Sequence, residues 1–228
     1  MAKQAGLHPS TTYRILQALV QEDLLAQDPE NGKYRLGLGL LRLGELAKLI
    51  NDLIRVARPH VEKLAALWDE VTIVETMDKN FNLTKIFLIP SSYRVAANPS
   101  YDKSVPPHCI SAGKVLLAHL PAVQLDEYIS RGLVPLTDKT ITDPRQLKDE
   151  LRKVRHQGYA TNNEEQESGF IAFGVPIREM DGQVIAALSI GGPSSRLTQE
   201  KTLAIIESLM ITGRAISADL GCEASSPG

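Results

Sequence analysis

The sequence predicts an α+β protein with a short helical segment and hairpin at its N-terminus, followed by a larger domain in which helices flank an antiparallel sheet. Three observations support this fold class. A helical apolar pattern and a hairpin sequence occupy the first 37 residues, and an apolar stripe at helical spacing follows over residues 38–58. Alternating β-rich runs around tight-turn sequences then recur near residues 71–89 and 170–190.

The first segment predicts two helices joined by a tight turn. Gly6 suits the left-handed conformation of such a turn, and Pro9 suits the first turn of the next helix. One side of that helix is apolar and comprises Thr12, Ile15, Leu16, Leu19 and Val20. The other side carries hydroxyl, amide and guanidinium groups, which suit phosphate oxygens and base edges in a DNA major groove: Ser10, Thr11, Tyr13, Arg14 and Gln17.

A hairpin after this helix predicts a winged helix-turn-helix. Asn31-Gly32 separates two short strands, and Lys33 and Arg35 project from one face of the second strand, where they suit DNA phosphates. Two other interpretations stay open, because helical turns of this kind occur in ordinary helical cores and basic hairpins occur as plain solvated surfaces. Residues 1–37 are formally neutral, so charge does not decide between them. The chain opens inside what should be the second helix of this domain, so we expect an incomplete winged helix with reduced DNA affinity.

Composition indicates a soluble globular protein. The chain has 228 residues, of which 43% are apolar and 23% charged, and its formal net charge of −2 excludes a generally basic nucleic-acid coat. Cys109 and Cys222 lie far apart and the five histidines are scattered, so we expect neither a metal centre nor a cofactor. Without a membrane-length apolar run or a secretory leader, we expect a cytoplasmic protein that does not contact membranes.

Residues 38–58 have the strongest helical periodicity in the chain. They predict a long linker helix with one apolar stripe and a second stripe on which charges alternate in sign. We expect the apolar stripe to pack partly against its copy in a dimer, and the alternative is that it lies on the second domain. Pro59 is expected to end or restart the helix.

The remaining sequence predicts the larger domain, over residues 59–221, with a flexible tail at 222–228. Strands are expected at 71–77, 83–89, 170–178 and 183–190, with hairpin turns at 78–80 and at Asp181-Gly182. Helices are expected at 111–120, 122–131 and 144–157, and a final one runs to Leu220. Asp143 should cap the 144–157 helix and Thr198 the final one, whose inward face includes Leu203.

Two short patterns could carry chemistry. Ser111 and Lys114 have the S-x-x-K spacing of some serine acyl-transfer enzymes, in which the lysine helps to deprotonate the serine. Four residues with two fixed positions recur by chance, so we favour Ser111 as a helix cap, at a helix start whose N–H groups could receive a carboxylate. The acidic run at residues 162–167 has the composition of a solvated loop.

Several motifs in a fixed order resemble the IclR family of bacterial transcriptional regulators over essentially the whole chain. They are A-x-x-x-G-L-x-x-S-T-x-x-R-x-L-x-x-L at residues 2–19, K-Y-R-L-G at 33–37, H-C-x-S-A-G-K at 108–114 and G-Y-A-x-x-x-E-E at 158–165. Gly169, Val175-Pro176-Ile177, Gly182 and A-A-L-S-I-x-G-P at 186–193 complete the resemblance.

The resemblance implies a winged helix-turn-helix, a linker helix and a GAF-like domain that binds a small organic effector. By the family pattern, the effector pocket is lined by Ser111, Ala112, Gly113, Asn162, Phe170, Ala172, Ser189 and Gly191. Several relatives carry aspartate at position 162, cysteine at 172 and serine at 191, so this pocket is expected to be more neutral and roomier. We therefore expect a bulkier carboxylate effector, such as an aromatic acid, rather than a glyoxylate-like or pyruvate-like one.

These expectations together describe a regulator without catalytic activity, acting as a homodimer or homotetramer on double-stranded operator DNA. The protein would have two conformations that differ in how the DNA-binding parts are placed. The effector would favour the conformation that it binds more tightly. A serine hydrolase using Ser111 and Lys114 is the alternative from another class. A third interpretation is an effector sensor that does not bind DNA.

Overall fold

The computed structural model describes residues 6–29, 31–94, 96 and 105–222, with side chains described outside residues 42–51. The chain divides between Leu53 and Ile54 into two compact units, each described by itself. In the first unit, Gly6 has a φ of +64° and forms the predicted turn. Helix α2 follows over Pro9–Gln21, with its proline in the first turn, where no intrahelical N–H bond is lost.

The wing is an antiparallel hairpin of β1 (Leu25–Gln27) and β2 (Tyr34–Leu36), with Ala26 opposite Arg35. The backbone N–H of Asp28 donates to the Lys33 carbonyl oxygen at 2.8 Å, which closes the turn around a left-handed Gly32. The predicted helix and hairpin are thus confirmed. One predicted inward side chain is wrong, because Ile15 is exposed in the structure. The buried side of this unit is therefore narrower than the apolar pattern suggested.

Helix α3 is continuous over thirty residues, Gly39–Trp68, so the predicted break at Pro59 is wrong. A proline inside a helix removes one N–H bond and crowds the preceding turn. Pro59 is exposed, so the carbonyl left unpaired can face solvent, while Ala57, Val61 and Leu64 on the other side are buried. Burial of this apolar stripe offsets the lost bond. The part of the predicted dimer stripe that falls at residues 42–51 lies outside the described side chains.

The second unit contains a five-stranded antiparallel sheet in the order β4-β3-β7-β6-β5. The predicted hairpin of β3 (Val71–Met77) and β4 (Leu83–Ile89) is confirmed, as is that of β6 (Phe170–Arg178) and β7 (Val184–Pro193). Strand β5 (Ala160–Asn163) was not predicted, because its polar sequence lacks an alternating apolar pattern. It pairs with β6 at the sheet edge.

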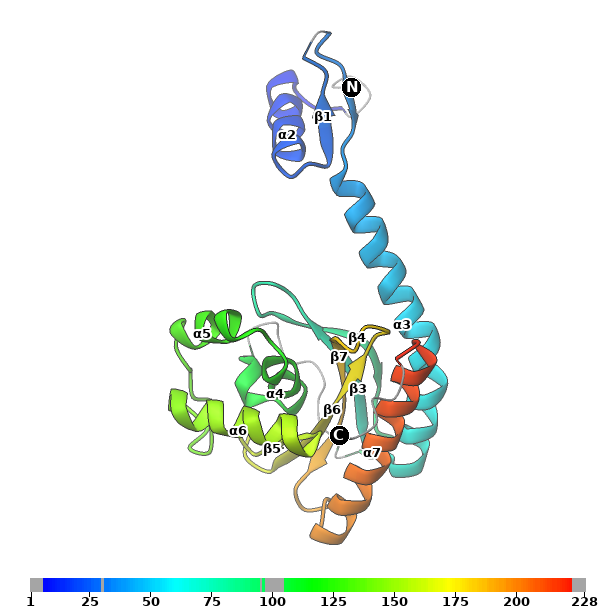
Figure 1. The fold of residues 1–228 in the computed structure, drawn as a ribbon, viewed down its shortest axis with the longest axis vertical. Helices are drawn as coiled ribbons and strands as arrows, with labels where there is room; N and C mark the ends of the chain where they lie inside the picture. The colour runs from blue at the N-terminus through cyan, green and yellow to red at the C-terminus, as the bar shows by residue number, and fades with distance from the viewer. Residues whose placement is uncertain (1–5, 30, 95, 97–104, 223–228) are drawn as a thin grey trace. The chain divides into compact units, whose positions relative to one another are not determined.

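Helices cover both faces of this sheet (Figure 1). One face is covered by α7 (Gln199–Asp219) beside the C-terminal part of α3, and His60 of α3 meets Asp219 of α7 at 2.8 Å. The other face carries the 3₁₀ turn η1 (Pro107–Cys109), α4 (Ser111–Ala118), α5 (Ala122–Ser130) and α6 (Pro144–Gln157). A hydrophobic core lies between these elements and the sheet, with Val115, Leu147, Leu151 and Ala187 fully buried.

Helix ends follow the sequence in one case and depart from it in another. The Asp143 carboxylate accepts the N–H groups of Arg145 and Gln146, so the predicted cap of α6 is confirmed, and Gly158 ends this helix with a φ of +83°. Thr198 precedes α7 but its side chain makes no capping hydrogen bond. Leu203 in α7 was predicted to face inward and is exposed instead.

Candidate functional site

The residues predicted to contact DNA lie on the surface of the first unit. Six of the seven are exposed: Ser10, Thr11, Tyr13, Arg14, Lys33 and Arg35. Gln17 is half-buried, and the Ser10 hydroxyl lies 2.8 Å from Nδ1 of His8. Within the described residues no carboxylate forms a salt bridge with Arg14, Lys33 or Arg35. The structure places the five α2 residues on one helix and the two basic residues on the wing.

The residues predicted to line the effector pocket meet on one face of the sheet in the second unit. Asn162 of β5 lies opposite Ala172 of β6, which lies opposite Gly191 of β7. Two residues further along, Ser189 of β7 lies opposite Gly174 of β6. Because side chains alternate between faces along a strand, these five positions share one face. That face is the one on which α4 lies.

Two glycines bring α4 into contact with its neighbours. A β-carbon at Gly174 would lie 2.9 Å from the carbonyl carbon of Ser111, so only glycine lets the first turn of α4 rest on β6. A β-carbon at Gly113 would lie 2.2 Å from the Pro107 carbonyl oxygen, so this glycine admits η1 on the other side. The start of α4 is therefore held between the sheet and η1. The sequence reasoning missed Gly174, although a glycine inside a β-strand indicates close approach of another backbone.

Ser111 presents an unpaired hydroxyl at the start of α4. The N-cap position belongs to Ile110, so the expectation that Ser111 caps the helix is wrong. The Ser111 side chain is fully buried and its Oγ has no hydrogen-bond partner. Lys114 is the first residue of α4 whose N–H reaches a carbonyl of the preceding turn, that of Ile110, at 2.9 Å. The N–H groups before it have no partner along the helix, as at any helix start.

Asn162 orders the acidic run that follows it. Its Oδ1 accepts the backbone N–H groups of Glu165 at 2.9 Å and Gln166 at 3.4 Å, and its Nδ2 donates to Gln166 Oε1 at 3.4 Å. Thr140 Oγ1 also donates to the Glu165 carbonyl at 2.7 Å. The expectation of a solvated loop is therefore wrong, since these residues form an ordered, partly buried turn. The Asn162 amide carries two N–H groups, and one of them donates to Gln166.

A buried ion pair joins α4 to this turn. Lys114 Nζ donates to Glu165 Oε1 at 2.6 Å and to the Thr161 carbonyl at 2.7 Å, and the two side chains are 1% and 8% exposed. The same lysine would have to accept a proton from Ser111 in an acyl-transfer enzyme. Ser111 Oγ has no hydrogen-bond partner, so the nucleophile and base of that mechanism do not meet. The geometry does not support the hydrolase.

Phe170 fills the space that Gly191 leaves. A β-carbon at Gly191 would lie 2.7 Å from Cζ of Phe170 and 2.7 Å from Cβ of Ala172. The expectation of a roomier pocket is therefore wrong at this position, because the aromatic ring occupies the volume of the missing side chain. Phe170 and Ala172 give this part of the site an apolar wall. Ser189 adds a buried hydroxyl, which donates weakly to the Ile73 carbonyl at 3.4 Å.

His108 holds the segment before α4 through a closed hydrogen-bond network. The Tyr128 hydroxyl accepts the His108 backbone N–H at 3.2 Å and donates to Nδ1 of the ring at 2.5 Å, while Nε2 donates to the Val134 carbonyl at 3.2 Å. Burial lowers the pKa of His108 and raises the pKa of Tyr128. Burial, with the nearby Glu165 charge, raises the pKa of the Cys109 thiol to about 12, so this cysteine is not a nucleophile at neutral pH.

Neither a metal site nor a membrane span is found in the described part of the chain. No three His, Cys, Asp or Glu side chains among the described residues cluster as metal ligands would. No described helix combines the length and apolar character needed to cross a bilayer.

Comparison with known proteins identifies the family. Residues 49–218 match the C-terminal domain of the bacterial transcriptional regulator IclR, and residues 1–29 match the IclR helix-turn-helix domain. The regulator KdgR of Escherichia coli K12 is 33% identical, covering 97% of this chain and 84% of its own. The transcriptional repressor AllR of the same strain is 32% identical, covering 94% of this chain and 79% of its own.

A solved structure extends the similarity to the fold. An IclR homologue from Microbacterium hydrocarbonoxydans, crystallised in complex with 4-hydroxybenzoate, matches with a TM-score of 0.69 and 29% identity. The match covers 96% of this chain and 88% of that one. These matches span both parts of the chain in the expected order. The chain therefore belongs to the IclR family of bacterial transcriptional regulators.

Proposed function

We propose that this regulator binds an organic carboxylate at the start of α4 and operator DNA through α2 and the wing. The observation that carries the ligand half is the buried, unpaired hydroxyl of Ser111 at a helix start. A buried polar group without a partner costs free energy, so a ligand that accepts a hydrogen bond from it gains affinity. Gly174 lies beneath the same turn and supports this placement, because the absence of a side chain there lets the start of the helix rest on the sheet.

The donors around Ser111 favour a carboxylate over a cation. The N–H groups of the first turn carry partial positive charge, and the amide of Asn162 offers a further N–H. Lys114 is turned toward Glu165 and Thr161, so the carboxylate would be held by hydrogen bonds rather than by a salt bridge with it. Phe170 and Ala172 offer an apolar surface to the ligand body, which favours an aromatic acid. The relative crystallised with 4-hydroxybenzoate supports this ligand class.

The DNA half of the proposal rests on α2 and the wing. The exposed Arg14 and the hydroxyl and amide groups of α2 suit base edges and phosphates, and Lys33 and Arg35 suit flanking phosphates. We further propose a homodimer or homotetramer, because one small unit of this kind makes few contacts and a second copy would double them. Sedimentation measurements on the full chain test the oligomer, and a monomer at working concentrations would contradict it.

Thermal unfolding tests the ligand half. We expect 4-hydroxybenzoate to raise the melting temperature saturably and 4-hydroxybenzamide, which lacks the charge, to raise it far less. Ser111→Ala should weaken the apparent affinity for 4-hydroxybenzoate about tenfold, the effect of one lost hydrogen bond to a charged group. Ser130→Ala is the matched control, because Ser130 is an exposed serine on α5. An equal apparent affinity for 4-hydroxybenzoate in Ser111→Ala and wild type would contradict a ligand site at Ser111.

Selection of duplexes from a random library, followed by fluorescence anisotropy on the selected duplex, tests the DNA half. We expect Arg14→Gln to weaken binding at least tenfold and Arg152→Gln, an exposed arginine on α6, to leave it unchanged. If the wild-type chain enriches no duplex, the DNA half fails for this polypeptide and the sensor without DNA binding becomes the better description. The ligand half would be unaffected by that result.

A further inference from the structure

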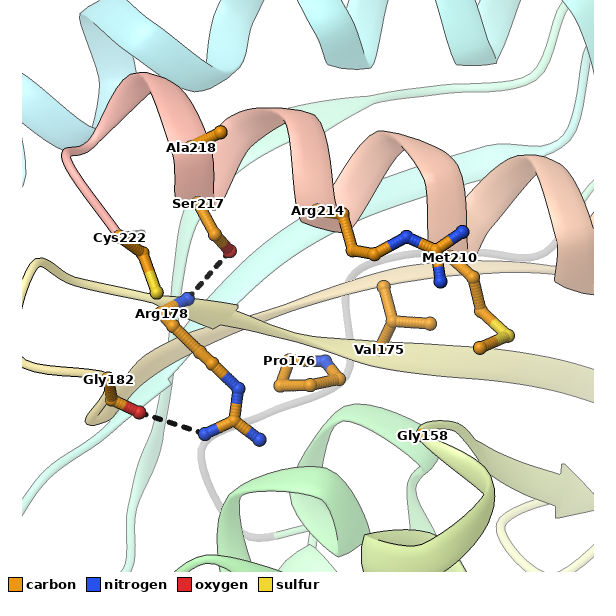
Figure 2. A pocket seen from close by; sticks show the side chains of 10 residues that line it. All are labelled: Gly158, Val175, Pro176, Arg178, Gly182, Met210, Arg214, Ser217, Ala218 and Cys222. Atoms are coloured by element: carbon orange, nitrogen blue, oxygen red, sulfur yellow. Dashed lines mark hydrogen bonds between the residues drawn. The ribbon is translucent and has the colours of Figure 1, made fainter. Parts of the chain in front are cut away.

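A cavity lies at an uncovered edge of the sheet, away from the start of α4. Strand β5 pairs with β6 only as far as Ala160 opposite Gly174, whereas β6 continues to Arg178. The last residues of β6 therefore have no strand on that side. The end of α6 at Gly158 and the C-terminal half of α7 lie beside this gap and enclose a cavity of about 480 Å³ (Figure 2). This volume is in the range of pockets that hold small organic ligands.

The strand edge in this cavity does not offer a site for a further β-strand. Pro176 has no N–H group, and the N–H of Arg178 already donates to Ser217 Oγ at 2.9 Å. Ser217 Oγ in turn donates to the Gly213 carbonyl at 2.7 Å. The walls are instead apolar, with Val175, Pro176 and Met210 among the lining residues. The cavity therefore suits the apolar body of a small molecule.

Two arginines give this apolar cavity a positive charge. The Arg178 guanidinium is fixed, because Nη1 donates to the Gly182 carbonyl at 2.8 Å and Nη2 donates to Nε2 of His119 at 3.0 Å. Arg214 reaches from α7 toward Val175 and Met210 (Figure 2). It makes no hydrogen bond or salt bridge with any described residue. Among the described residues that line the cavity, none is acidic.

We propose that this cavity is a second ligand site, which binds a monocarboxylate with an apolar chain. The carboxylate would pair with the guanidinium of Arg214, while the remaining N–H groups of Arg178 provide further donors. The chain of the ligand would lie against Val175, Pro176 and Met210. This site uses β6, α7 and the end of α6, so it is separate from the proposed effector site at the start of α4 and does not depend on it.

Alkylation of Cys222 tests the proposal on the full chain. Cys222 lines the cavity, whereas Cys109 is fully buried, so iodoacetamide should report on Cys222 at neutral pH. We expect hexanoate to slow the alkylation of Cys222 saturably, with the modified residue identified by peptide mass spectrometry. Hexanamide has the same chain without the charge and should need at least about a tenfold higher concentration for the same protection. Equal protection by the acid and the amide would overturn the carboxylate assignment.

Three variants test whether hexanoate protects Cys222 by binding in this cavity. Arg214→Gln should raise the half-protecting hexanoate concentration about tenfold, since it removes a charged donor that has no partner among the described residues. Arg145→Gln is the matched control, because Arg145 is an exposed arginine at the far end of α6 from Gly158, and it should not change protection. Ala218→Trp, which enlarges a residue that lines the cavity, should weaken hexanoate protection. Absence of saturable protection in wild type, or the same protection in Arg214→Gln, would overturn the proposal.

Discussion

The buried ion pair between Lys114 and Glu165 provides the sharpest test of how α4 is attached to the rest of the domain. Its atoms lie 2.6 Å apart and its side chains are 1% and 8% exposed. Lys114→Met would leave the Glu165 carboxylate buried without its cation and the Thr161 carbonyl without its donor. Removing one partner of a buried pair costs about 3–5 kcal/mol, a large share of the roughly 5–15 kcal/mol stability of a typical domain.

A double-mutant cycle separates the pair from simple loss of packing. Replacing both partners, as Lys114→Met with Glu165→Leu, removes the uncompensated charge, so this variant should be more stable than Lys114→Met alone. We expect a coupling free energy of at least about 2 kcal/mol between the two positions. Glu165→Gln retains a carbonyl oxygen that can accept from Lys114, so it should lose less stability than Lys114→Met.

Urea unfolding followed by the fluorescence of Trp68, the only tryptophan in the sequence, measures these free energies in the second unit. Lys148→Met is the matched control. Lys148 pairs with Asp126 at the same distance of 2.6 Å, but the two side chains are 47% and 62% exposed. Exposed pairs contribute less than about 1 kcal/mol. The reasoning would be refuted if Lys114→Met cost no more than Lys148→Met, or if the cycle gave no coupling.

Three further predictions concern pH, packing and the ligand. Burial lowers the pKa of His108 and of His119, so below their ordinary value of 6.5 the unfolded chain binds more protons. The free energy of unfolding should therefore fall as pH drops below about 6.5, and a profile from urea titrations that stays flat from pH 7 to about 5.5 would contradict this. Gly113→Ala should cost about 2–3 kcal/mol in urea unfolding, because its β-carbon would meet the Pro107 carbonyl at 2.2 Å, and a change below about 0.5 kcal/mol would disprove that contact. Asn162→Asp should weaken 4-hydroxybenzoate binding about tenfold, since it removes an N–H donor and adds a negative charge. The thermal shift produced by the uncharged 4-hydroxybenzamide should change less. Equal changes for both ligands would argue against a carboxylate near Asn162.

Much of the fold could be predicted from local sequence patterns. The helix starting at Pro144 with Asp143 as its cap, and the hairpin around Asp181-Gly182, formed where the sequence placed them. These elements depend on neighbours within a few residues, so the sequence contains the information directly. Pro59 shows the limit of local rules, because burial of residues far from it in sequence keeps α3 continuous through the proline.

The candidate site could be predicted only in part. The family resemblance pointed to Ser111, Asn162 and Ser189. The sheet register brings Asn162 and Ser189 to one face, and the start of α4 with Ser111 rests on that face at Gly174. It did not reveal that Gly174 supports the start of α4, or that Phe170 fills the space beside Gly191. Close approaches between strands and helices depend on backbone positions that no sequence spacing gives.

The sequence by itself determined the order of the two parts, the family and most helices and hairpins, because each depends on short-range periodicity, turn residues and motifs. Only the tertiary structure decided what Lys114 does: its spacing to Ser111 suggested a catalytic base, but the chain brings Glu165 beside it from fifty-one positions away. The cavity lined by Arg178 and Arg214 was likewise invisible in the sequence. Both arise from the meeting of distant segments, and the free energy of such contacts depends on distance and burial in space rather than on separation along the chain.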